Sequence, residues 1–126
     1  MLAQLLQSHT DQIQVLEVIG RIDANNAVWL TLDVDNALAS GRNQVIFDLS
    51  GVLYINSAGL RELVQIWNNV QHAGGMVLIV NPSDYARKVL ELVGLDSVFA
   101  MQTDPNWDLF ARRHSPRLHR QTRYYS

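Results

Sequence analysis

The chain has 126 residues with 48% hydrophobic side chains, enough to bury one core but too few for two ordinary domains. It has no cysteine, no apolar run near bilayer length and no signal-like N-terminus, so disulfide and thiol chemistry are excluded and a soluble cytoplasmic protein is expected. All twelve acidic residues lie within residues 1–111, which carry a formal charge of −7, whereas residues 112–126 carry +5.

The first part of the chain predicts strands and one helix. QIQVLEVIG (12–20) alternates apolar and polar residues as a strand does, and residues 1–8 are expected to pair with it as a hairpin across residues 9–11. A first helix, ending at Gly41, is predicted by apolar residues at helical spacing: Ala27, Leu30, Val34, Ala37 and Leu38. Trp29 lies off this stripe, and we expect it to be exposed as part of a contact patch.

The middle of the chain alternates between strand and helix patterns. QVIFDLSGV (44–52) has the β-branched and aromatic centre of a buried parallel strand. From Leu60 the apolar residues recur on one face of a helix that ends at Gly74-Gly75. MVLIVN (76–81) predicts the next strand, which Pro82 closes.

The last part of the chain predicts two helices, one strand and a tail. Ser83 can cap a helix that Gly94 ends, SVFAMQ (97–102) predicts a strand, and PNWDLFARR (105–113) predicts a short terminal helix. Residues 112–126 are expected to form a loose, solvated tail outside a single domain of residues 1–111. Its arginines are candidates for contact with an acidic surface: Arg112, Arg113, Arg117, Arg120 and Arg123.

This alternation predicts an α/β fold with a parallel portion in the central sheet and flanking helices. The turn in LYINSAGL (53–60) then lies at the carboxyl end of a strand, where such folds usually present binding or reactive groups. A side-chain oxygen of Ser57 or Asn56 that accepts a free helix N–H would stabilise the helix by about 1 kcal/mol, and we expect Ser57 to cap it. A phosphate on Ser57 would be tolerated in the same place because the helix dipole attracts anions.

Other kinds of site are not supported by the sequence. Ser57 is not part of a Gly-x-Ser-x-Gly elbow and has no nearby histidine as a general base, so hydrolase chemistry is not expected. The four histidines show no paired ligand spacing: His9, His72, His114 and His119. We therefore expect no enzyme activity, metal or cofactor.

The segment VIFDLSGVLYINSAGLRELVQIWNNVQHAGGMVLIVNPSDYARKVLELVGL (45–95) resembles a STAS domain, and specifically the bacterial anti-sigma factor antagonists. VLEVIGRIDANNA (15–27) resembles the first strand and turn of that family, so the similarity covers roughly residues 15–107. In the family the turn usually reads Asp-Ser-Ser-Gly-Leu or Asp-Ser-Thr-Gly-Leu. A partner kinase that is also the anti-sigma factor phosphorylates the first serine, which corresponds to Ser57.

Two residues depart from the family pattern. Asn56 replaces the usual Asp, which keeps a capping oxygen but removes a negative charge beside the acceptor hydroxyl. Ala58 replaces the second hydroxyl residue, so Ser57 is the single hydroxyl within the motif.

The resemblance implies a four- or five-stranded mixed sheet with flanking helices, and a non-enzymatic switch. Unphosphorylated protein would sequester an anti-sigma factor serine kinase, phosphate on Ser57 would release it, and a serine phosphatase would restore binding. ATP and magnesium would belong to the kinase, and no direct nucleic acid contact is expected. The implied partner-binding residues are Asp23, Asn25, Asn26, Asn56, Ser57, Ala58, Gly59, Arg61, Glu62 and Gln65.

Two alternatives remain open at this level. One is a STAS scaffold that is not phosphorylated and joins subunits of a signalling or transport assembly. The other is a STAS module that binds a small ligand such as a lipid or nucleotide near the Asn56 turn.

Overall fold

A computed structural model describes residues 10–114 and 119–126. Its strands are β1 (Ile13–Ile22), β2 (Gln44–Ile55), β3 (Met76–Val80), β4 (Ala100–Gln102) and β5 (His119–Tyr125). Its helices are α2 (Ala27–Ala39), α3 (Ser57–His72), α4 (Asp84–Leu92) and α5 (Trp107–His114), with short 3₁₀ turns η1 (Thr10–Gln12) and η2 (Leu95–Ser97). None of the helices in these two ranges has the length and apolar character needed to cross a membrane.

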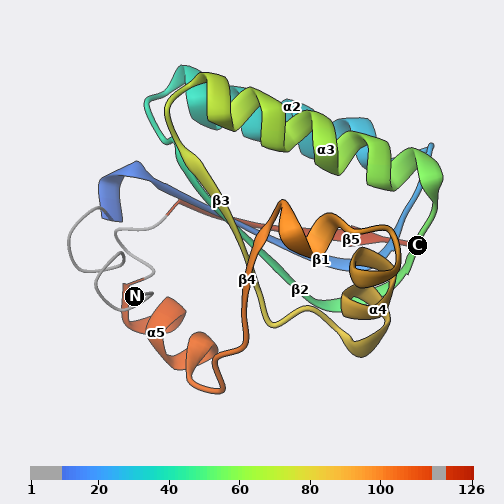
Figure 1. Cartoon of the computed structure of the whole chain (residues 1–126). Coiled ribbons are helices and arrows are strands. Elements are labelled where there is room, and N and C mark those ends of the chain that lie inside the picture. Colours follow the sequence, from blue (N-terminus) through green and yellow to red (C-terminus); the bar gives the residue numbers. More distant parts are fainter. Residues whose placement is uncertain (1–9, 115–118) are drawn as a thin grey trace.

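The five strands form one sheet in the order β4-β3-β2-β1-β5, and every neighbouring pair is parallel (Figure 1). The expectation of a mixed sheet is therefore wrong for the described residues. The physical reason is that a helix lies between each strand and the next one along the chain, so the chain crosses back and begins the next strand in the same direction. The predicted hairpin of residues 1–8 lies outside the described residues.

The expected loose tail is also wrong where the structure describes it. Arg112 and Arg113 lie in α5, and residues 119–125 form β5, which pairs with β1 from Gln14 to Gly20. β5 is held by charged contacts, since Arg123 donates to both carboxylate oxygens of Asp33 at 2.7 Å. Because polar and charged residues make up most of β5, its sequence lacks the alternation of apolar and polar residues that predicts a strand.

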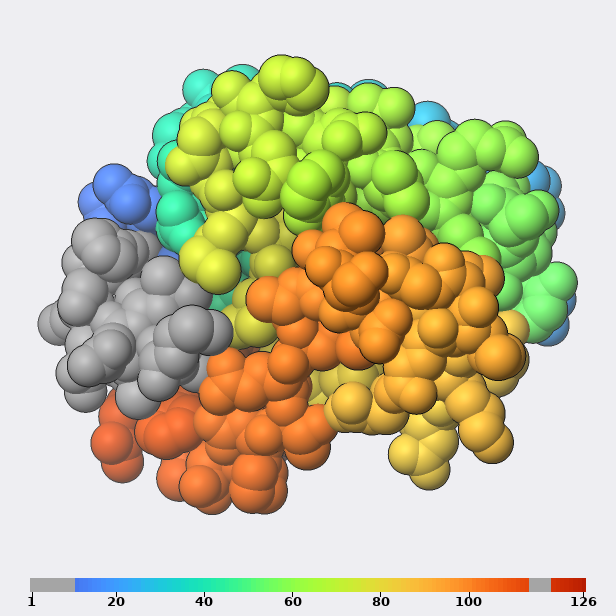
Figure 2. All heavy atoms as spheres, in the orientation of Figure 1, coloured from blue at the N-terminus to red at the C-terminus, as the bar shows by residue number. Residues whose placement is uncertain are grey.

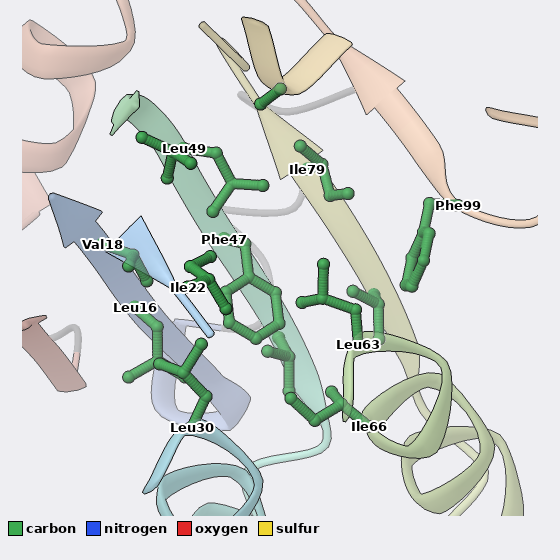
Figure 3. Packing of buried hydrophobic residues seen from close by; sticks show 14 of the residues in the cluster. Leu16, Val18, Ile22, Leu30, Phe47, Leu49, Leu63, Ile66, Ile79 and Phe99 are labelled. Carbon is green, nitrogen blue, oxygen red and sulfur yellow. The ribbon is translucent and has the colours of Figure 1, made fainter. Parts of the chain in front are cut away.

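The main core lies between one face of the sheet and α2, α3 and α4. Figure 1 shows α2 and α3 side by side along this face, and Figure 3 shows the strand residues packed against them. Its largest members come from β1, α2, β2 and α3 and include Leu16, Ile22, Leu30, Phe47, Leu49, Leu63 and Ile66. Ala86 and Leu90 of α4 complete it.

A second, smaller core lies on the other face, where α5 packs against the amino half of the sheet (Figure 1). Trp107 is buried there, and its indole Nε1 donates a 2.9 Å hydrogen bond to Oδ2 of Asp48. Oδ1 of Asp48 accepts from the backbone and hydroxyl of Ser50, so this buried carboxylate is fully partnered. The two cores fix both faces of the sheet that carries the turn at Ser57.

Candidate functional site

The turn between β2 and α3 is built by Asn56. Its backbone is extended, with φ −97° and ψ −177°, and its side-chain Oδ1 accepts a 2.9 Å hydrogen bond from the Gly59 N–H. Asn56 is therefore the N-cap, and the expectation that Ser57 caps the helix is wrong. The amide of Asn56 supplies the acceptor that the family's aspartate would offer.

Ser57 is the first residue of α3, and its side chain is exposed. Within residues 10–114 and 119–126, its hydroxyl has no hydrogen-bond partner. The backbone N–H groups of Ser57 and Ala58 also have no acceptor inside the helix, because the first turn lacks preceding carbonyls. In Figure 2 this amino end of α3 is the green surface at the right of the molecule. The hydroxyl thus stands free beside two unpaired backbone donors.

Gly59 lets the turn pack closely on the end of β1. A Cβ at this position would lie 2.6 Å from the backbone oxygen of Ile22, closer than real Cβ contacts allow. The same oxygen accepts a 3.2 Å hydrogen bond from the Asn56 N–H. The close approach requires glycine and places the loop after β1 beside the Ser57 turn.

The loop after β1 is held by its own side chains. Oδ1 of Asp23 accepts from the Asn25 N–H at 3.0 Å, and Oδ1 of Asn26 accepts from the Asp23 N–H at 3.1 Å. Nδ2 of Asn26 donates to the Arg21 carbonyl at 2.8 Å. The side chains of Asp23 and Asn26 therefore order the loop, whereas that of Asn25 is exposed. The structure places this loop beside the turn.

The remaining predicted contact residues divide into two groups. Arg61 and Gln65 are exposed on α3, as a partner contact requires. Glu62 is only half-buried and accepts a 2.7 Å hydrogen bond from the Thr31 hydroxyl, which joins α3 to α2. Ala58 is half-buried and Gly59 is buried, so both shape the turn more than its surface.

Sequence reasoning missed three residues near this turn. The Arg21 guanidinium lies 4.2 Å from the centre of the Tyr54 ring, and Tyr54 stacks on Tyr85 with ring centres 6.4 Å apart. Arg21 and Tyr54 are direct neighbours in the parallel register of β1 and β2. The signal that could have found them is the alignment of the two strand ends, which requires the positions of the bulges in β2.

The arrangement offers binding groups rather than reacting groups. Asn56, Ser57 and Gly59 present a hydroxyl and backbone donors at a helix amino end, a place that suits an anion. Across the described ranges, no three acidic or histidine side chains lie together as a metal centre would require. The one free nucleophile at the turn is the Ser57 hydroxyl.

Comparisons with known proteins agree on the fold. A family model for the STAS domain matches residues 5–110. BtrV of Bordetella bronchiseptica, named as a candidate anti-sigma factor antagonist, is 25% identical over 96 residues, which make up 76% of this chain and 83% of BtrV.

Solved structures give the same result. An anti-sigma factor antagonist from Mycobacterium paratuberculosis has a TM-score of 0.65 and 27% identity, and the match covers 82% of this chain and 87% of that chain. The phosphorylated form of SpoIIAA from Bacillus has a TM-score of 0.64 and 19% identity, covering 83% and 94%. At that identity SpoIIAA bears on the fold alone.

Proposed function

The chain belongs to the STAS domain family, and we propose that it is an anti-sigma factor antagonist that Ser57 switches between two binding states. In the unphosphorylated state it sequesters an anti-sigma factor, and in the phosphorylated state it releases it. The names of BtrV and of the mycobacterial structure support the antagonist class. The state of Ser57 is the part of the proposal that the geometry supports.

The observation that carries the proposal is the free hydroxyl of Ser57. Because Asn56 provides the cap, the hydroxyl can be modified without loss of the hydrogen bond that starts α3. A phosphate there would gain the unpaired N–H groups of the first turn and the favourable end of the helix dipole. The switch can therefore be set without unfolding the helix.

Release follows from electrostatics at the surface. A phosphate adds a charge of about −1.5 to −2 at neutral pH. An interface that formed around an uncharged serine would then bury or oppose this charge, which weakens binding strongly. In this proposal a partner serine kinase supplies ATP and magnesium, a serine phosphatase removes the phosphate, and the chain acts in the bacterial cytoplasm as a binding protein rather than an enzyme.

The test is the intact mass of the protein after incubation with ATP and candidate anti-sigma factor kinases from the same organism. Wild type should gain one phosphate, Ser57→Ala should gain none, and the exposed Ser40→Ala should behave as wild type. The phosphorylated protein should also leave the kinase on a sizing column. Phosphorylation that persists in Ser57→Ala would contradict the assignment of the site.

A second candidate function is a constitutive STAS scaffold, and an apolar surface on α2 favours it. Val28, Trp29 and Leu32 are exposed by 48%, 57% and 45% on consecutive turns, and Trp29 was expected to be exposed. Stable binding to a partner without any labelling of Ser57 would support the scaffold over the switch.

A further inference from the structure

We propose that the anti-sigma factor also contacts the half of the sheet face beyond α5, where Arg21 binds a carboxylate of the partner. This inference rests on the proposed antagonist function and adds the chemistry of the partner. The surface consists of Ile19, Arg21, Tyr54 and Tyr124, and we call it the open sheet face.

The position of α5 leaves this surface uncovered by the described residues. The sheet residues that pack with α5 come from the amino half of β1, from β2 and from β3: Ile13, Val15, Ile46, Leu78 and Val80. Farther along β1, Val18 and Ile22 point into the main core, so Ile19 and Arg21 between them point to the opposite face. Among the described residues, α5 is the helix that packs on this face, and it does so over the amino half of β1.

Neighbouring strands extend the same surface on both sides. Tyr124 of β5 is aligned with Ile19, and Tyr54 of β2 is aligned with Arg21. Because aligned residues of parallel strands share a face, these four side chains lie together. Gly51 leaves room for the Ile19 side chain, since a Cβ on Gly51 would lie 2.9 Å from Ile19 Cγ1.

The surface is apolar and aromatic to a degree that suits an interface. Tyr124 is 76% exposed. Tyrosine and arginine are enriched among residues that dominate binding energy, because each combines a large flat surface with polar groups.

Arg21 is held ready for a charged partner. Its guanidinium lies over Tyr54, which stacks on Tyr85 at an interplanar angle of 23°. The Tyr85 hydroxyl is fixed in turn, since it accepts from the Ile55 N–H at 3.2 Å and donates to the Ile55 carbonyl at 3.3 Å. A side chain ordered in this way loses less entropy on binding than a free one.

The Arg21 guanidinium has no carboxylate partner among residues 10–114 and 119–126. Arg120 pairs with Glu17 and Arg123 pairs with Asp33. Stacking occupies the flat face of a guanidinium and leaves its N–H edge available for a bidentate carboxylate. The occupant with matching chemistry is therefore an Asp or Glu of the anti-sigma factor, flanked by apolar side chains.

The open sheet face is continuous with the Ser57 turn. The carbonyl of Arg21 accepts from Asn26 in the neighbouring loop, and Tyr54 precedes Asn56 by two residues. A partner on the turn can thus reach Arg21 as well. A partner that brings a carboxylate to this end of the sheet would be repelled by a phosphate on Ser57, which gives the release step a specific cause.

The experiment uses full-length protein and the anti-sigma factor kinase that phosphorylates wild type but not Ser57→Ala. The dissociation constant of the complex is measured by calorimetry at one fixed salt concentration. We expect about a tenfold or greater loss of affinity for Arg21→Ala and Tyr124→Ala, and a larger loss for Arg21→Glu. Lys88→Ala, which removes an exposed charge from α4, should stay within about twofold of wild type. Thermal unfolding of each variant checks that the fold is retained.

The outcomes separate the inference from the function on which it rests. If wild type binds and releases the anti-sigma factor while Arg21→Glu and Tyr124→Ala bind equally well, the open sheet face is not part of the interface. If folded wild type binds none of the anti-sigma factors from its own organism, both the function and the inference are overturned. Equal losses for Lys88→Ala and Arg21→Ala would reduce the effect to net charge and would also overturn the role of Arg21.

Discussion

Asn56 and Ser57 have different roles at the turn: the Asn56 side chain caps α3, and the Ser57 hydroxyl stays free of hydrogen bonds to the described residues. Replacing Asn56 by Ala removes the hydrogen bond to the Gly59 N–H and should lower the free energy of unfolding by about 1 kcal/mol. Asn56→Asp should keep the cap and gain a few tenths of a kcal/mol or more from the helix dipole. Urea denaturation at pH 7 measures both.

The control for this prediction is Ser57→Ala. Since the Ser57 hydroxyl makes no hydrogen bond to the described residues, its removal should change the free energy of unfolding by less than about 0.5 kcal/mol. A larger loss for Ser57→Ala than for Asn56→Ala would show that the cap is assigned to the wrong residue.

Tyr125 has a buried hydroxyl that the fold leaves without a hydrogen bond to the described residues. Its hydroxyl is buried without a hydrogen-bond partner among the described residues, and burial, followed by the nearby Asp33 carboxylate, raises the pKa of Tyr125 above its usual value. Because the unpaired hydroxyl costs desolvation energy, Tyr125→Phe should be neutral or stabilise the protein by up to about 1 kcal/mol at pH 7.

The same residue predicts a dependence on alkaline pH. A pKa that is higher in the folded state means that the stability is complete below the unfolded pKa of about 10 and falls as the pH rises toward the folded value. Wild type should therefore lose stability above about pH 10 more steeply than Tyr125→Phe. Parallel slopes for the two proteins in urea titrations across this range would contradict the prediction.

At the scale of elements, β5 closes one edge of the sheet and ties the C-terminus to the rest of the domain. Removing residues 119–126 exposes the edge of β1 and deletes the packing of Tyr125 and the ion pair of Arg123 with Asp33. We expect the truncated protein to lose about 2–4 kcal/mol of stability, the range for loss of a large packed side chain. It should also self-associate through the bare strand edge.

Two measurements check this prediction. Urea denaturation gives the loss of stability, and light scattering on a sizing column gives the molecular mass. Arg123→Ala is the matched control, since it removes the ion pair but leaves the strand in place, and it should be less destabilised and remain in the wild-type association state. A truncated protein as stable as wild type would mean that β5 adds little to the fold.

Helices and inner strands were predictable because each has an apolar face that the sequence shows. Leu30, Leu63 and Leu90 lie on such stripes, and all three are buried in the main core. β5 was not predictable, because Thr122 and Arg123 are satisfied by Glu17 and Asp33 from distant parts of the chain. The all-parallel sheet was not predicted either. The sequence analysis expected residues 1–8 to pair with β1 as an antiparallel hairpin, whereas the structure pairs β5 with β1 in parallel.

The candidate site divides in the same way. The position of the Ser57 turn was predictable from the order of strand, turn and helix, whereas its neighbouring loop was implied by the family resemblance. The stack of Arg21 on Tyr54 was not, because it depends on a register that bulges in β2 shift by one residue at a time. The choice of Asn56 over Ser57 as the cap depends on where α3 begins, which an apolar pattern fixes only to within a few residues.

At the scale of the whole molecule, the charge separation in the sequence is partly resolved by folding. Arg120 and Arg123 of the basic tail lie against Glu17 and Asp33 of the acidic body. These two arginines therefore pair within the chain itself, and contact of the tail with an acidic surface of a partner stays a prediction. The hydrogen bond to the Asp33 carboxylate also raises the pKa of Arg123 above its usual value.

We expect phosphorylation of Ser57 to change the surface of a domain that stays folded. Each core lies between one face of the sheet and the helices that cover it, whereas Ser57 is exposed at the amino end of α3. Phosphorylated protein should therefore match or exceed the stability of the unmodified protein by about 0.3–1 kcal/mol, because its phosphate faces the helix amino end. Changes in backbone amide chemical shifts should be confined to residues 21–26 and 54–62. Shift changes that reach α5, or a lowered midpoint of thermal unfolding, would show instead that phosphate releases the partner by loosening the fold.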